Sequence, residues 1–367
     1  MTQVFNLEKF LVDVFDPVAG EKVAVMTDVP TPTCPDNQDW RDRRTMAVEW
    51  RSGLERLGER IGFEVLPLVT YPATGANNAN LPEEAETGGR KVPMAAIMDQ
   101  VSLVLALTEF SPTAPLTDVC RRRPGAHVFR AASMPGIEKR MEGTSLAADY
   151  REVARRCRLL KEVFLTADHA EVEFSTGHRC FFDLRYRICE SDDGYLHRDK
   201  SDDVPVINLP SGETFQVPYE GERPGEPSRT AGELPVREAE ETVVFRVEGN
   251  RIVEVAGACA AAERYRRVFA EDPARANIAE LAFGCNERAV VTGNVLEDEK
   301  AGFHWAYGRS DHLGGTIGPA QFKSPATVIH QDIVYAAGNP IGIARADLVA
   351  LDGTRTTIIR DGAYVLW

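Results

Sequence analysis

Short apolar runs alternate with amphipathic runs over the first 135 residues of the chain. The runs at 21–29 and 63–71 are typical of buried strands, and apolar residues recur every three or four positions over 43–61, which predicts a helix. A short helix over 95–100 precedes the strand-like VSLVLALT, and a helix over 118–123 precedes the extended AHVFRAAS. Strands that alternate with helices predict an α/β domain with a mainly parallel sheet.

The pattern changes after the amphipathic segment 145–164, which predicts a long helix. Strand-like segments then follow one another: AEVEFS, CFFDLRYRI, TVVFRVEG and RIVEVAG, the last two joined by the turn dipeptide Gly249-Asn250. A helix is expected over 260–270, and paired strands after residue 335. The second half is therefore predicted to be an α+β domain with mostly antiparallel sheet.

We place the boundary between an α/β domain, 1–145, and an α+β catalytic metal-binding domain, 146–367. A chain of 367 residues exceeds the size of one ordinary domain. The Pro-, Gly- and Glu-rich segment 220–241 is predicted to be a surface loop or lid with little order of its own.

Composition narrows the function classes. The net charge is −14, which argues against nucleic-acid binding and against anionic membranes. No run approaches the about 18 apolar residues that span a bilayer, and the N-terminus lacks a secretory signal, so we expect a cytoplasmic protein. The seven cysteines are scattered and never spaced CxxC, which disfavours a disulfide framework and a thiolate zinc site. No GxGxxG or GxxxxGK[ST] supports a nucleotide site.

Candidate chemistry concentrates between residues 277 and 335. Glu280 lies in an apolar run, where a carboxylate is rarely left unpaired. His330 and Asp332 are two apart in the strand-like VIHQDIVY, so both side chains reach one face. Taken alone, that pair could also be a surface histidine beside a surface aspartate.

Three further candidate ligands are Glu299, His304 and Glu213. Glu299 and His304 are five apart, a spacing that needs a bend near Gly302 to bring them together. The neighbouring charges, Lys300 among them, could also be a solvated run. Glu213 follows a Pro-Ser-Gly turn in another strand-like segment. Two histidines and four carboxylates without thiolate would suit two ions of Zn²⁺, Co²⁺ or Mn²⁺, or Fe²⁺.

Four segments in this order, LPSGETFQVP, NIAELAFGCN, EDEKAGFHWAYG and VIHQDIVY, resemble the metal-site segments of the aminopeptidase T and aminopeptidase S metallopeptidases. The resemblance implies a two-metal aminopeptidase or related amide hydrolase that acts on a small molecule or short peptide, and a homodimer. Carried over position by position, it implies these metal ligands: Glu213, Glu280, Glu299, His304, His330 and Asp332. Glu280 would bridge the ions, and Glu213 or Glu299 would be a catalytic base.

The sequence also departs from the family pattern. The family has a tyrosine seven residues after the histidine of its DEN element; here that position is Asp311, and the nearest tyrosine, Tyr307, becomes a catalytic candidate. Lys300 stands in the third place of DEN. The dihydroxypyridine ring-cleaving dioxygenases resemble the same scaffold and hold one Fe(II), so a mononuclear iron dioxygenase is the alternative. A binding protein without activity is a further one.

Overall fold

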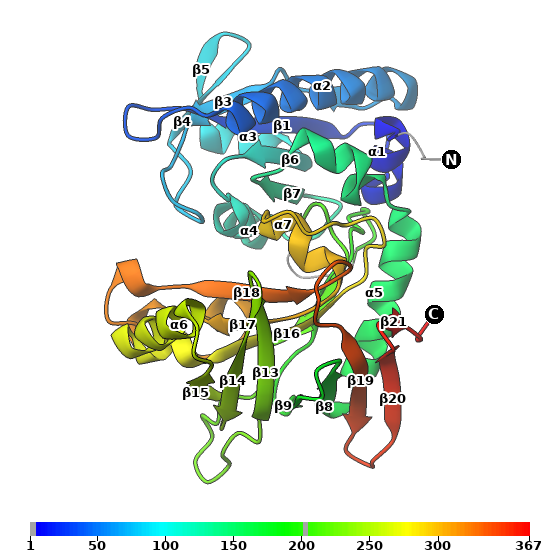
Figure 1. Cartoon of the computed structure of the whole chain (residues 1–367). Coiled ribbons are helices and arrows are strands. Elements are labelled where there is room, and N and C mark those ends of the chain that lie inside the picture. The colour runs from blue at the N-terminus through cyan, green and yellow to red at the C-terminus, as the bar shows by residue number, and fades with distance from the viewer. Residues whose placement is uncertain (1–4, 201–204) are drawn as a thin grey trace. The chain divides into compact units, whose positions relative to one another are not determined.

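A computed structural model describes residues 5–200 and 205–367 of the chain (Figure 1). By contacts the chain divides into two compact units whose segments interleave. The first contains residues 1–154, 192–211 and 286–297, and the second contains 155–191, 212–285 and 298–367. The predicted domain boundary after residue 145 stays a prediction, because the units are defined by contacts rather than by independent folding.

The first unit is built on an eight-stranded sheet with the order β11-β7-β6-β1-β3-β4-β5, and β2 pairs with β1. The pairs among β11, β7, β6, β1 and β3 are parallel, while β3-β4-β5 is antiparallel. The strands are β1 (Lys22–Val29), β2 (Glu64–Val65), β3 (Val69–Pro72), β4 (Glu84–Thr87), β5 (Arg90–Pro93), β6 (Leu103–Thr108), β7 (Arg130–Pro135) and β11 (Val206–Asn208). The mainly parallel sheet predicted for this part of the chain is confirmed.

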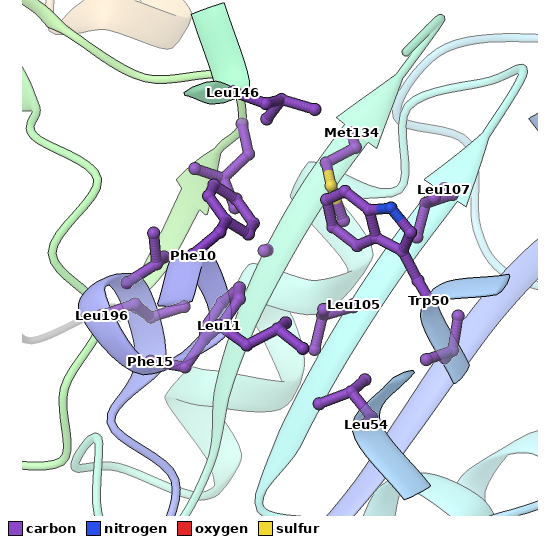
Figure 2. Close-up of a cluster of buried hydrophobic side chains, with 14 of the residues drawn as sticks. Phe10, Leu11, Phe15, Trp50, Leu54, Leu105, Leu107, Met134, Leu146 and Leu196 are labelled. Carbon is purple, nitrogen blue, oxygen red and sulfur yellow. The ribbon is translucent and has the colours of Figure 1, made fainter. Parts of the chain in front are cut away.

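Helices cover both faces of this sheet because its central strands are apolar on both sides. The helices are α1 (Leu7–Phe15), α2 (Gln38–Ile61), α3 (Met94–Gln100) and α4 (Thr113–Arg122). On one face, α1 and α2 pack Phe10 and Trp50 against Leu105 of β6 (Figure 2). On the other, Ile97 of α3 and Leu116 of α4 pack against the alternate strand positions. The structure thus adds α1, which the sequence pattern did not predict.

The second unit contains two largely antiparallel sheets. One has the order β10-β12-β16-β17-β18 and the other the order β15-β14-β13-β9-β8-β19-β20-β21. The first sheet consists of β10 (Glu190–Asp192), β12 (Glu213–Gln216), β16 (Ile278–Gly284), β17 (Phe303–Gly308) and β18 (His330–Tyr335). The second consists of β8 (Ala167–Phe174), β9 (Arg179–Asp183), β13 (Ala231–Glu238), β14 (Glu241–Glu248), β15 (Arg251–Ala256), β19 (Ile343–Ala350), β20 (Arg355–Arg360) and β21 (Ala363–Tyr364). Antiparallel sheet is what the short consecutive strands predicted.

The remaining α-helices of the described residues are α5 (Tyr150–Phe164), α6 (Ala260–Glu271) and the short α7 (Val295–Asp298). The chain passes from the first unit to the second within α5. The hairpin predicted at Gly249-Asn250 joins β14 to β15, and both turn residues have positive φ, as a two-residue hairpin turn requires. Within residues 5–200 and 205–367, no helix has the length and apolar character needed to cross a membrane.

The segment 220–241 is more ordered than predicted. Residues 231–238 form β13, which pairs with β14 along its whole length, and Leu234 and Val236 are buried. The prediction of a segment with little order of its own is wrong for residues 231–238. The apolar positions of ELPVRE form a strand there, although the surrounding Pro and Glu residues suggested a loop.

Candidate metal centre

Strand β16 presents two different faces. Glu280, Ala282 and Gly284 alternate with Leu281 and Phe283, so one face carries a carboxylate among very small residues and the other carries large apolar side chains. Phe283 packs on Phe303 at 5.5 Å between ring centroids, which fixes the apolar face inside the unit. The small side chains of the other face leave room for groups from neighbouring strands.

The pairing of strands brings the predicted ligands onto that face. Directly opposed residues of antiparallel strands share a face. Ala282 of β16 is opposite His304 of β17, and Gly284 is opposite Glu213 of β12. On the far side of β17, Ala306 is opposite Asp332 of β18, and Gly308 is opposite His330.

The side chains converge in two groups of three that share Glu280. Within the described residues, Glu213, Glu280 and His304 form one set of possible metal ligands, and Glu280, His330 and Asp332 form another. His304 Nε2 lies 3.3 Å from Glu213 Oε2 and 3.7 Å from Glu280 Oε1. His330 Nε2 lies 3.0 Å from Glu280 Oε2 and 3.4 Å from Asp332 Oδ1.

Backbone carbonyls determine which nitrogen of each imidazole faces the carboxylates. His304 Nδ1 lies 3.2 Å from the carbonyl oxygen of Gly302, and His330 Nδ1 lies 2.7 Å from that of Arg309. A carbonyl can only accept a hydrogen bond, so each Nδ1 carries a proton and each Nε2 is directed to the carboxylates. Metal-bound histidines are oriented in this way.

Without a metal, protons can balance the negative charge. Burial lowers the pKa of both imidazoles, but the adjacent carboxylates outweigh burial and raise the pKa of His304 and of His330 well above the usual value. Burial raises the pKa of Glu280, but the two nearby histidines prevail and lower it to about 2. The site therefore attracts positive charge strongly.

Lys300 supplies one such charge from within the chain. Its side chain is fully buried, and Nζ donates to Glu213 Oε1 and to Glu299 Oε1, each at 2.5 Å. Burial raises the pKa of Glu213, but the Lys300 charge and His304 lower it to about 2. Burial and the charge of Glu213 raise the pKa of Glu299 well above its ordinary value. Lys300 is thus not part of a solvated charge run, which was one reading of the sequence.

Two glycines allow the turn that carries Glu299 and Lys300 to lie against the sheet. A Cβ at Gly284 would be 2.4 Å from the carbonyl oxygen of Glu299, and one at Gly302 would be 2.6 Å from that of Tyr335. Both approaches are shorter than any side chain tolerates. The bend near Gly302 expected from the sequence is present, and Glu299 joins the cluster through Lys300 rather than through either ligand group.

The donor set fits a divalent metal ion. Glu213 Oε2, His304 Nε2 and Asp332 Oδ1 are buried and form no hydrogen bond within the described part of the chain. Buried polar atoms usually have partners, so these three atoms indicate missing cations, which can be protons or metal ions. Nitrogen and oxygen donors without sulfur suit Zn²⁺, Co²⁺, Mn²⁺ or Fe²⁺.

The loop that contains Ser310, His312 and Thr316 borders the cluster and is bound by Glu220. The Glu220 carboxylate accepts hydrogen bonds from Ser310 Oγ and from both the backbone N–H and the hydroxyl of Thr316. Within this loop, the His312 ring lies edge-on to the His330 ring, with 5.0 Å between centroids. Burial lowers the pKa of His312 to about 4, which keeps this imidazole neutral at physiological pH. Neither residue was among the sequence-based candidates.

Tyr307 is not positioned for catalysis. It alternates with His304 and Ala306 along β17 and therefore lies on the opposite face of the strand. Its ring packs on Phe269 of α6 at 5.3 Å, and it is 4% exposed. The catalytic role predicted for Tyr307 gains no support from this position, because closeness in sequence to the family position ignored the strand's alternation.

Comparison with solved structures places this fold beside two enzymes. The structure superposes on a 2,5-dihydroxypyridine dioxygenase from Pseudomonas putida with a TM-score of 0.63 and 16% identity, covering 100% of this chain and 98% of that one. It superposes on AmpT from Thermus thermophilus with a TM-score of 0.57 and 15% identity, covering 98% of each chain. No protein-family model and no curated protein sequence matches the chain. At these identities the likeness shows a shared fold.

Proposed function

We propose that this chain is a metal-dependent hydrolase that activates water against an amide bond. The observation that carries the proposal is the pair of three-residue groups that share Glu280. Carboxylates and imidazoles from four strands converge there, with orphaned donor atoms that a metal ion would satisfy. The likeness to AmpT, an aminopeptidase T, supports an aminopeptidase-like activity in particular.

A bound divalent ion would polarise the scissile carbonyl and lower the pKa of a water molecule. The chain's own residues would do the rest. Glu280, His330 and Asp332 would hold the ion, and the backbone carbonyl of Arg309 keeps the His330 ring in the required tautomer. His330 and Glu299 are 20% and 19% exposed in their side chains, more than the other four, so substrate would approach from their side.

Glu299 is the residue we assign to proton transfer. It belongs to neither ligand group, so its carboxylate is not needed to hold metal, and it accepts a hydrogen bond from Lys300 Nζ. Its raised pKa is shifted in the direction that a general base working near neutral pH needs. Glu213, the other candidate base, has a lowered pKa and belongs to a ligand group, which favours a role in binding.

A mononuclear Fe(II) dioxygenase is the second candidate, because the fold also resembles the 2,5-dihydroxypyridine dioxygenase. The donor set argues for hydrolysis. The facial triad of non-haem iron oxygenases has two histidines and one carboxylate. The accessible ligand group, which contains the partly exposed His330, has one histidine and two carboxylates, Glu280 and Asp332.

The test is activity at full metal loading. The protein, reconstituted in turn with Zn²⁺, Co²⁺ and Mn²⁺, should cleave some members of a panel of aminoacyl p-nitroanilides, and Glu299→Gln should abolish cleavage while retaining metal. The same protein with Fe²⁺ and oxygen should leave 2,5-dihydroxypyridine intact. Ring cleavage without anilide cleavage would establish the dioxygenase instead.

We also propose a substrate class and an oligomeric state. A small molecule or short peptide is the proposed substrate, and a homodimer is the proposed assembly. Light scattering on the purified chain measures the mass of the assembly directly. A monomer at micromolar concentration would contradict the dimer and leave the metal centre untouched.

A further inference from the structure

Lys300 is buried beside a site that already attracts cations. Its side chain is 0% exposed, and its ammonium group bridges Glu213 Oε1 and Glu299 Oε1 at 2.5 Å each. Those two carboxylates and His304 are half of the six ligands from which two metal ions were predicted. An ammonium group between two carboxylates supplies a positive charge beside ligands predicted for a metal ion.

We propose that Lys300 takes the place of one metal ion, so that the centre binds a single divalent ion through Glu280, His330 and Asp332. This inference rests on the proposed metal centre and specifies its composition. The Lys300 side chain is covalently part of the chain, so this cation does not dissociate.

Charge and geometry oppose a second ion. An ion held by Glu213, Glu280 and His304 would share the Glu213 carboxylate with the ammonium group of Lys300. Like charges on one buried carboxylate repel strongly because little water screens them. Lys300 also keeps Glu299 bound to itself, so this carboxylate is not released to complete that ligand group.

The accessible ligand group carries no such restriction. His330 Nε2 lies 3.0 Å from Glu280 Oε2 and 3.4 Å from Asp332 Oδ1, whereas the Lys300 ammonium group donates to Glu213 and Glu299. Asp332 Oδ1 has no hydrogen bond to any part of the chain that the structure describes, and His330 Nε2 is directed to both carboxylates. This group therefore offers two carboxylate oxygens and one imidazole nitrogen to a single ion.

The experiment counts metal ions per chain by mass spectrometry after equilibration with Zn²⁺ or Mn²⁺ and removal of excess ion. Wild type should retain one equivalent, with any second ion at least about 100-fold weaker, as expected for like charges at close range. Lys300→Met, which keeps the side-chain length without the charge, should retain two. Lys300→Arg, the matched control that keeps the charge, should retain one.

Two equivalents in wild type would overturn the inference while supporting the proposed function, and so would one equivalent in a folded Lys300→Met variant. No retained metal in wild type would instead overturn the proposed function. If Lys300→Met does not fold, two ligand variants decide the matter. Asp332→Asn should lose the tightly bound ion and Glu213→Gln should keep it; the reverse result would place the ion in the other group and overturn the inference.

Discussion

His330 Nε2 lies 3.0 Å from Glu280 Oε2, while Nδ1 of the same ring lies 2.7 Å from the carbonyl oxygen of Arg309. The carbonyl takes one proton of the ring, so Nε2 faces the carboxylate either as a second N–H, which the raised pKa of His330 favours without metal, or as a lone pair beside a metal ion. Two electron-rich atoms at this distance need a cation between or beside them. The pairing of His330 with Glu280 therefore marks the proposed metal centre, and substituting either residue tests it.

Replacing either His330 or Glu280 should weaken metal binding strongly. His330→Ala and Glu280→Gln are each expected to weaken Zn²⁺ binding by more than about 100-fold, since even residues that only support a ligand contribute 10–100-fold. Competition with a chromophoric chelator measures the affinity. His178→Ala is the matched control, because His178 lies in the same unit and contacts Thr176 rather than the cluster. Unchanged affinity in both ligand variants would show that the site is misassigned.

Gly284 should be intolerant of any side chain. Gly284→Ala would bring a Cβ within 2.4 Å of the Glu299 carbonyl and displace the turn that carries Lys300. We expect weaker metal binding and a loss of about 1–3 kcal/mol in the free energy of unfolding, as for overpacking of other interiors. Urea denaturation followed by circular dichroism provides the measurement. Gly342→Ala should have little effect, since a Cβ there meets nothing within 4 Å.

Tyr307 should matter for stability and not for chemistry. Tyr307→Phe keeps the ring that packs on Phe269 and should retain metal affinity and catalytic rate within about twofold. Tyr307→Ala should cost about 3–5 kcal/mol of unfolding free energy through the cavity it leaves. A loss of turnover in Tyr307→Phe with unchanged stability would restore its catalytic role.

Asp183 should contribute stability that disappears in acid. Burial raises its pKa, but hydrogen bonds from Arg185 and Arg229 outweigh burial and lower it from 3.8 to about 2. Because the folded-state pKa is the lower one, the contribution is complete above the unfolded value and is lost as pH falls from about 4 through about 2.

Asp183→Asn should therefore lower the free energy of unfolding by about 2 kcal/mol at pH 7 and flatten its dependence on pH below 4. Denaturant titrations at several pH values measure both effects. Glu233→Gln, at an exposed position of β13, is the control and should change neither. An Asp183→Asn profile parallel to that of wild type would contradict the assignment.

The periodicity of the sequence sufficed for most elements and for the face of each ligand strand. The two-residue spacing of His330 and Asp332 placed both on one side of β18, as expected. The shared face of Glu213 and Glu280 depends on β12 pairing with β16, a contact between residues about seventy positions apart that no local pattern encodes. The face of Tyr307, in contrast, could be read from the local alternation of β17 and was overlooked.

Lys300 could not be interpreted from its neighbours alone. A charged run at 297–300 is usually solvated, and only the close approach allowed by Gly284 buries this lysine against the sheet. The signal present in the sequence was the departure from DEN, which marked the position without giving its geometry. α1 was also missed, although Phe10, Leu11, Val14 and Phe15 recur at helical spacing within it.

Anomalous diffraction from crystals grown with Zn²⁺ or Mn²⁺, measured at the absorption edge of the metal, tests the central claim most directly. We expect a peak bounded by the side chains of Glu280, His330 and Asp332, within coordination distance of all three. Crystals at full metal loading with no peak among these residues would contradict it.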